Sequence, residues 1–169
     1  EVRGSNNGED MLRRVQAVCF SPLALYNGWA SSKKLWTHAA VKDAIRDAIV
    51  LRLRMLPYFY HSFAQYHHQG TPVIRPLQLA AGIGALAQQA TGKLDATANP
   101  YEVPPAVREV KDQYFFGDSL LVAPIAAGAK TRKVLLTAGR WYDFHTGKFA
   151  GENQTIEVML KKDSRIREL

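Results

Sequence analysis

The sequence changes its periodicity once, and the block from residue 112 to 147 shows the second pattern most clearly. This block reads DQYFFGDSLLVAPIAAGAKTRKVLLTAGRWYDFHTG, with three strand-like runs, three glycine-marked turns and many aromatic residues. Short apolar runs between glycine or proline turns are typical of an antiparallel sandwich. From residue 70 onward we expect strands at 73–74, 114–116, 119–123, 133–137, 141–145 and 155–160. The sequence therefore predicts an antiparallel β-sandwich for its second half.

Helical spacing dominates the first half. Residues 9–20 read as a short helix that Pro22 ends, and Thr37 is a suitable N-cap for a long helix over about 38–66. Between residues 48 and 60 this long helix is apolar nearly all round, which indicates burial on more than one side.

Two details refine this prediction. Pro57 lacks a backbone donor, so we expect a kink near residues 53–57. Residues 21–27 are too few for a helix and too apolar for an exposed loop, which favours a short buried strand that opens into a loop at Asn27 and Gly28.

Composition narrows the classes of function. The chain has 169 residues, of which 47% are hydrophobic, so it can bury a core. Its net charge of +7 would suit a nucleic acid, but the basic residues fall in short separate clusters, and we expect no nucleic-acid partner. Cys19 is the only cysteine and stands in an apolar run, which indicates a buried, unreactive thiol. No segment has the roughly eighteen consecutive apolar residues that a membrane span needs.

Three segments carry a resemblance to a known family. The helical run RDAIVLRLRMLPYFYHSF (46–63), the joint GTPVIRPL (70–77) and the block at 112–147 follow one another with similar spacing in glycoside hydrolase family 31, the α-glucosidase and α-xylosidase group. The resemblance implies an α+β fragment, made of the last α/β unit of a (β/α)8 TIM barrel and the first C-terminal β-sandwich. It implies a barrel part at 1–69 and a sandwich at 70–169, and we read residues 79–107 as an insertion that is partly helical at 83–90.

The resemblance also implies a reaction. Members of this family hydrolyse α-linked sugars of the α-glucoside or α-xyloside type with retention, using one aspartate as nucleophile, a second as acid/base, and no cofactor. Both aspartates lie upstream of the part that this chain resembles, so we expect the chain to lack a catalytic residue, to need the N-terminal part of the same barrel, and to be inactive alone. The compartment stays open, although many relatives of this kind are periplasmic or secreted.

One stretch offers candidate sugar-binding residues. In family 31 the pattern F-x-P-x-x-R-x-H ends the last barrel strand, and its histidine binds the sugar beside the cleaved bond. The similar stretch here is FSPLALYN, with Leu25 and Asn27 at the positions of the arginine and histidine. An asparagine amide can still donate and accept hydrogen bonds with hydroxyls. We therefore expect Asn27, with Tyr26 or Trp29, to contact the substrate, an α-glycoside; a plain turn at Asn27 is the alternative.

Other residues invite different functions. A stand-alone carbohydrate-binding or structural β-sandwich module could bind sugar through Trp141, although strand alternation requires one face of the run 141–144 to be core. Asp112, Asp118 and Asp143 stand at strand or turn positions, where backbone contacts are the usual role.

Two further patterns in the sequence resemble a metal site and a dinucleotide-binding motif, but neither has the features that such a site requires. His67 and His68 are neighbours rather than four residues apart, so we expect no metal site. The G-x-G-x-x-A match at 82–87 is not followed by the parallel strand of a βαβ unit, so we expect no dinucleotide.

Overall fold

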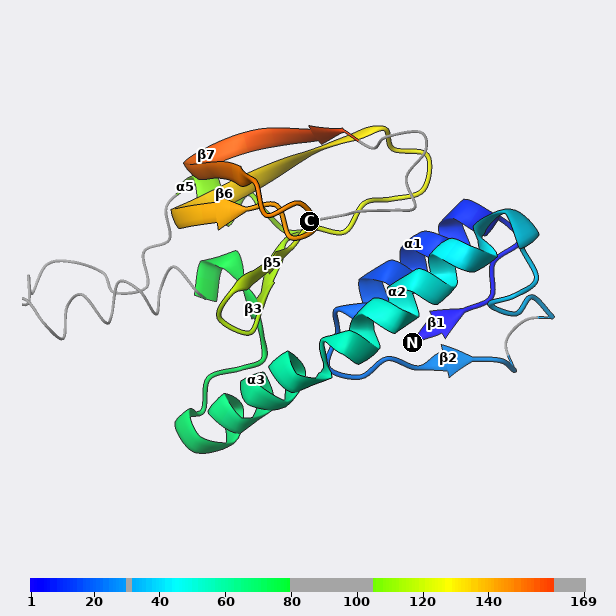
Figure 1. The fold of residues 1–169 in the computed structure, drawn as a ribbon. Coiled ribbons are helices and arrows are strands. Elements are labelled where there is room, and N and C mark those ends of the chain that lie inside the picture. Colours follow the sequence, from blue (N-terminus) through cyan, green and yellow to red (C-terminus); the bar gives the residue numbers. More distant parts are fainter. Residues whose placement is uncertain (30–31, 80–104, 160–169) are drawn as a thin grey trace, which may run out of the picture.

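The structure is a computed structural model that describes residues 1–29, 32–79 and 105–159 (Figure 1). The first half contains β1 (Val2–Arg3), α1 (Gly8–Cys19), β2 (Tyr26–Asn27), the 3-10 helix η1 (Ala39–Val41), α2 (Lys42–Arg54) and α3 (Leu56–Gln69). The second half contains β3 (Ile74–Pro76), α5 (Pro105–Arg108), β4 (Tyr114–Phe116), β5 (Leu120–Val122), β6 (Thr131–Tyr142) and β7 (Phe149–Met159). The described residues form no closed barrel. None of the helices in these ranges is both long and apolar enough to cross a bilayer.

The first half is built around α1. The helix begins after Asn7, whose side-chain oxygen accepts a hydrogen bond of 3.1 Å from the backbone N–H of Asp10, the arrangement of an N-cap. Its buried face, which includes Met11 and Val15, packs with Ile45 of α2 and with β1 in one core cluster. The helix predicted at 9–20 is confirmed, and so is the burial of Cys19.

The long helix predicted over 38–66 is wrong as a single element, because the chain forms two helices that meet at Met55 (Figure 1). Pro57 explains the break, since its ring would clash inside a continuous helix but fits the first turn of a new one. The kink expected at 53–57 is therefore confirmed. Helix α3 runs on to Gln69 and ends at Gly70, which adopts the left-handed conformation at φ 72°.

Thr37 is not the N-cap that the sequence predicted. Its hydroxyl accepts a hydrogen bond of 2.8 Å from the backbone N–H of Lys34, so it closes the turn before the helix. The helical region begins with η1, after His38. A threonine can satisfy a preceding turn as easily as a following helix, and the sequence signal is the same for both.

The strand predicted over 21–27 is shorter than expected and has a partner that the sequence did not reveal. Only Tyr26–Asn27 form β2, and they pair in parallel with β1, with Val2 opposite Tyr26 and Arg3 opposite Asn27. Arg52 of α2 holds the connection before β2, because its guanidinium donates to the carbonyl oxygens of Cys19 and Ser21, both at 2.7 Å.

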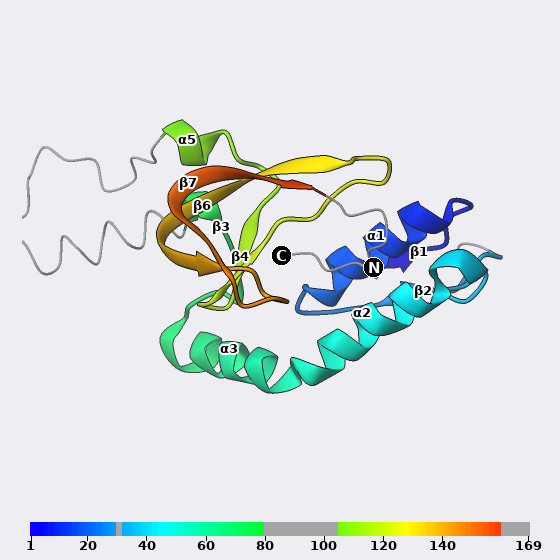
Figure 2. The same ribbon diagram turned by 45° about the horizontal axis from the view of Figure 1, so that its top comes forward.

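The second half contains two antiparallel sheets, one ordered β3-β4-β5 and one formed by β6 and β7 (Figure 2). The three-stranded sheet lies between the helices and the β6–β7 pair. On one of its faces Phe116 packs against Phe59 of α3, with ring centroids 4.4 Å apart. On the other face Phe115 packs against Trp141 of β6 at 5.8 Å. The alternation of side chains along β4 thus joins the helical half to the outer sheet.

The strands predicted at 133–137 and 141–145 are one strand in the structure. Strand β6 continues through Gly139, which has φ 112° and lies at a shift of register between Leu136 and Arg140. The glycine therefore marks a bulge inside a strand, where the sequence had indicated a turn. The expected run at 155–160 belongs to the longer β7. Of the insertion predicted at 79–107, residues 80–104 lie outside the described residues, as do the helix expected at 83–90 and the motif at 82–87.

A cluster of hydrogen bonds joins α3 to the turn between β4 and β5. The hydroxyl of Tyr58 donates to the carbonyl oxygen of Phe116 at 2.8 Å and accepts from the N–H of Ser119 at 3.0 Å. Gly117 stands between these two residues with φ 60°, and a β-carbon there would overlap the hydroxyls of Tyr58 and Ser62. This close approach fixes the position of the sheet on the helix.

Candidate functional site

The strands β1 and β2 have two faces with different surroundings. On one face, Val2 is buried and Tyr26 is partly buried against the core that α1 and α2 form. Because side chains alternate along a strand, Glu1, Arg3 and Asn27 belong to the opposite face. In an α/β barrel the helices surround the strands on the outside, and the other face of each strand points inward. The face that carries these three polar residues is thus the one that would line a barrel interior.

Asn27 lies at the centre of this polar face. Its amide nitrogen donates to Oε1 of Glu1 at 3.0 Å, and Nε of Arg3 donates to the same carboxylate oxygen at 3.2 Å. The amide oxygen of Asn27 accepts from the backbone N–H of Trp29 at 3.0 Å. A glutamate carboxylate is ionised at neutral pH, and hydrogen bonds from Asn27 and Arg3 lower the pKa of Glu1 further below its usual value.

The other two predicted site residues are placed differently. Tyr26 lies on the helix side, and its hydroxyl donates to the carbonyl oxygen of Lys33 at 2.6 Å, which ties the loop after β2 back to the strand. The loop has a second tie, from Nζ of Lys34 to the carbonyl oxygen of Gly28, also at 2.6 Å. The side chain of Trp29 is 100% exposed. The structure therefore brings Asn27 and Trp29 together through one hydrogen bond and places Tyr26 on the other face.

Sequence reasoning missed Glu1 and Arg3. A strand of two residues has no periodicity to detect, and the run EVRGSNNGED is polar and rich in turn residues. The one available signal was Val2, a single β-branched residue between charged neighbours, which is the smallest unit of an alternating pattern.

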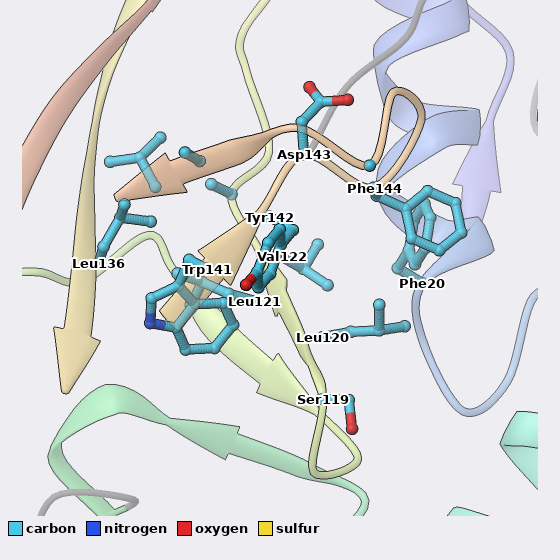
Figure 3. Close-up of a pocket in the computed structure, with 14 residues that line it drawn as sticks. Phe20, Ser119, Leu120, Leu121, Val122, Leu136, Trp141, Tyr142, Asp143 and Phe144 are labelled. Carbon is cyan, nitrogen blue, oxygen red and sulfur yellow. The ribbon is translucent and has the colours of Figure 1, made fainter. Parts of the chain in front are cut away.

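A cavity of about 320 Å³ lies elsewhere, between the two sheets of the second half and Phe20 (Figure 3). Its walls are mainly apolar, and most of them come from β5, β6 and the turn after β6. The residues that line the cavity are Phe20, Ser119, Leu120, Leu121, Val122, Ala123, Val134, Leu136, Trp141, Tyr142, Asp143, Phe144, Gly147 and Ala150. A sugar presents several hydroxyls, whereas Ser119, Tyr142 and Asp143 are the polar side chains in this wall. The cavity is poorly matched to a sugar.

The polar and aromatic groups of this wall already have structural roles. Oδ1 of Asp143 accepts hydrogen bonds from the backbone N–H groups of His145 and Thr146 and from the Thr146 hydroxyl, at 2.6 to 3.0 Å. In Figure 3 its carboxylate points away from the aliphatic side chains. The indole N–H of Trp141 donates to the carbonyl oxygen of Thr137 at 3.0 Å, and its ring packs on Phe115. Trp141 is therefore part of the core.

Asp112 and Asp118 also make ion pairs. Asp112 contacts Nη2 of Arg132 at 2.9 Å, and Asp118 contacts Nη2 of Arg75 at 3.0 Å. Each is a stabilising contact within the second half of the chain. Within the described ranges, no group of three or more His, Cys, Asp or Glu side chains gathers where it could hold a metal ion.

Comparison with known proteins agrees with this architecture. The model of the glycosyl hydrolase family 31 TIM-barrel domain matches residues 3–62, and that of the family 31 C-terminal domain matches residues 70–167. Neutral alpha-glucosidase AB of Dictyostelium discoideum is 32% identical over 153 residues, which cover 86% of this chain and 14% of that protein. Alpha-glucosidase 2 of Bacillus thermoamyloliquefaciens is 25% identical over 181 residues, which cover 96% of this chain and 20% of that protein.

Solved structures give the same result. The family 31 dextranase of Flavobacterium johnsoniae, in complex with isomaltotriose, superposes with a TM-score of 0.68 at 26% identity, over 90% of this chain and 17% of the dextranase. The chain thus spans a fifth or less of each of these three relatives. Since the C-terminal domain model alone matches residues 70–167, more than half of the chain, the protein belongs to glycoside hydrolase family 31.

Proposed function

We propose that this chain supplies the last α/β unit of a (β/α)8 barrel and the first C-terminal β-sandwich of a retaining α-glycosidase. The observation that carries the proposal is the parallel pair β1–β2, which α1 and α2 cover on one face while the other face carries Glu1, Arg3 and Asn27. A parallel pair backed by helices is the repeating unit of such a barrel. We place the boundary between the two parts near residue 70, where α3 ends.

In this account the chain binds sugar but does not cleave it. Retaining hydrolysis needs two carboxyl groups about 5 to 5.5 Å apart, one as nucleophile and one as acid/base. Asp112, Asp118 and Asp143 are held in other contacts, so we assign the reacting pair to the rest of the barrel. Asn27 would hydrogen-bond a hydroxyl of the sugar next to the cleaved bond, and the exposed ring of Trp29 would lie against the sugar face.

Tyr26 has a supporting part in the same proposal. Its hydroxyl donates to the loop carbonyl of Lys33, and its ring packs on the helix side. We therefore assign it the positioning of the loop that carries Trp29 and leave direct contact with the sugar to Asn27.

The substrate that we propose is an α-glucoside, with an α-xyloside as the second candidate. The relatives named above are α-glucosidases and a dextranase bound to isomaltotriose. Leu25 and Asn27 stand where the family pattern has arginine and histidine, and an uncharged amide would favour recognition by hydrogen bonds over recognition by charge.

A stand-alone carbohydrate-binding module is the other candidate, and the structure favours it less. Its proposed ligand residue, Trp141, packs on Phe115, and the cavity beside it is mainly apolar. An independent sandwich also has no need for the exposed apolar side chains of Leu56 and Phe63 on α3, which suit contact with further parts of a barrel.

Proton NMR of the first product tests the proposal. The full-length protein that contains this chain should release glucose from 4-nitrophenyl α-glucoside, a substrate with a single sugar, and the α-anomer should appear before mutarotation produces the β-anomer. A β-anomer as first product would exclude a retaining mechanism. No hydrolysis of α-glucosides or α-xylosides would exclude the proposed activity.

A further inference from the structure

We propose that Glu1 is a positioning residue that fixes the side-chain amide of Asn27 in a single orientation toward the sugar. The inference rests on the proposed function, because Asn27 is there assigned to the sugar, and it adds a residue that the family resemblance did not supply. The geometry that carries it is the chain of contacts from Arg3 through Glu1 and Asn27 to the backbone of Trp29.

The two ends of the Asn27 amide meet partners of opposite character. The Glu1 carboxylate can only accept a hydrogen bond, and the backbone N–H of Trp29 can only donate one. A rotation of the amide by 180° would place the amide oxygen against the carboxylate and the NH₂ group against the N–H. Both contacts would then be repulsive, so together they favour one orientation of Asn27 over the other.

Charge strengthens this selection. The hydrogen bond from Asn27 to Glu1 has an ionised acceptor, and such bonds are about twice as strong as those between neutral groups. Nε of Arg3 donates to the same carboxylate oxygen, at 3.2 Å, and so holds Glu1 in place. Arg3 and Asn27 are register partners in β1 and β2, so the backbone pairing itself keeps the three side chains together.

A fixed amide matters because a sugar hydroxyl can either donate or accept. An asparagine free to rotate could present its oxygen or its NH₂ group, and binding would then have to order it. With Glu1 in place, this ordering is complete before the sugar arrives. Glu1 thus sets which edge of Asn27 faces the sugar without any contact of its own to the reacting atoms.

The first test uses the full-length protein that contains this chain and a matched pair of substitutions. Glu1→Gln removes the charge and supplies an amide that can donate as well as accept, so the Trp29 N–H is then the contact of the two that still selects the orientation of Asn27. We expect KM for isomaltose to rise about fivefold to tenfold, the size of one hydrogen bond, with kcat changed by less than about twofold. Glu157→Gln makes the same chemical change at an exposed position on β7 and should leave both values unchanged.

A double-mutant cycle shows whether Glu1 acts through Asn27. In the Asn27→Ala background, Glu1→Gln should have no further effect on KM, because the amide it positions is gone. Two results would overturn the inference: a KM for Glu1→Gln equal to that of the wild type, or the same rise in KM from Glu1→Gln in the wild-type and Asn27→Ala backgrounds.

A second measurement needs no activity and keeps the inference separate from the proposed function. In the full-length protein that contains this chain, labelled with ¹⁵N on asparagine, the side-chain NH₂ signals of Asn27 should shift as Glu1 titrates, with a midpoint below the ordinary glutamate value, and this shift should vanish in Glu1→Gln. Signals that do not respond to acid would overturn the inference even in an active enzyme. A clear response in a protein inactive on α-glycosides would instead overturn the proposed function and leave the contact established.

Discussion

At the scale of single residues, Gly117 is a position where both the backbone and the packing constrain the choice. Its φ of 60° is left-handed, and a β-carbon would overlap the hydroxyls of Tyr58 and Ser62. We expect Gly117→Ala to lower the free energy of unfolding by about 2 to 4 kcal/mol, from backbone strain together with overpacking. Gly128→Ala is the matched control, since Gly128 has φ 81° and open space around it. It should cost about 1 kcal/mol. The free energy of unfolding of both variants is measured by urea denaturation, and an equal decrease in the two would contradict the packing argument.

Asp118 gives the second prediction at this scale. Partial burial raises the pKa of its carboxyl group, but hydrogen bonds from Arg75 at 3.0 Å and Gln65 at 2.6 Å outweigh burial, and the pKa lies below the ordinary value of 3.8. A lowered pKa in the folded state adds stability that is present above about pH 4 and is lost as the pH falls through the folded pKa.

Asp118→Asn should therefore lose this contribution at neutral pH and show a smaller decrease in melting temperature between pH 5 and pH 2 than the wild-type chain. The melting temperature of both proteins, measured across this range, checks the prediction. Parallel curves would show that Asp118 has the same pKa in the folded and unfolded states.

At the scale of elements, the hydroxyl of Tyr58 makes two of the hydrogen bonds that join α3 to the β4–β5 turn. Tyr58→Phe keeps the ring on Phe116 but leaves the carbonyl oxygen of Phe116 and the N–H of Ser119 without this partner. We expect a loss of about 1 to 2 kcal/mol in the free energy of unfolding. Tyr60→Phe removes the same hydroxyl from a side chain that is 80% exposed, and should change stability little. A similar loss in both variants would mean that the hydroxyl of Tyr58 is not a link between the two halves.

The elements also show how far the sequence could lead. Helix α1 and the strands 114–116 and 119–123 were predictable within a residue or two, because apolar spacing and turn residues agree there. Gly139 was misleading, since a glycine in a bulge and a glycine in a turn look the same without the partner strand. Thr37 was misleading as well, because a threonine that closes a preceding turn and a threonine that caps a following helix look the same in the sequence.

At the scale of the whole molecule, the family resemblance predicted a sugar-binding role for Asn27 but did not indicate the residues that surround it. Its neighbours Glu1 and Arg3 stand 24 or more positions earlier in the sequence, and only the parallel pairing of β1 and β2 brings them together. Likewise, the contact of Phe115 with Trp141 shows that the tryptophan belongs to the core, a choice that alternation alone had left open. Sites that depend on pairing between distant strands require the fold.

The central claim is that this chain binds the sugar and that the reacting carboxylates come from the rest of a family 31 barrel. The most direct measurement compares glucose release from isomaltose by the isolated 169-residue chain and by the full-length protein that contains it. We predict no release by the isolated chain and steady release by the full-length protein. Hydrolysis by the isolated chain would contradict the account, because a catalytic pair would then have to lie within these 169 residues.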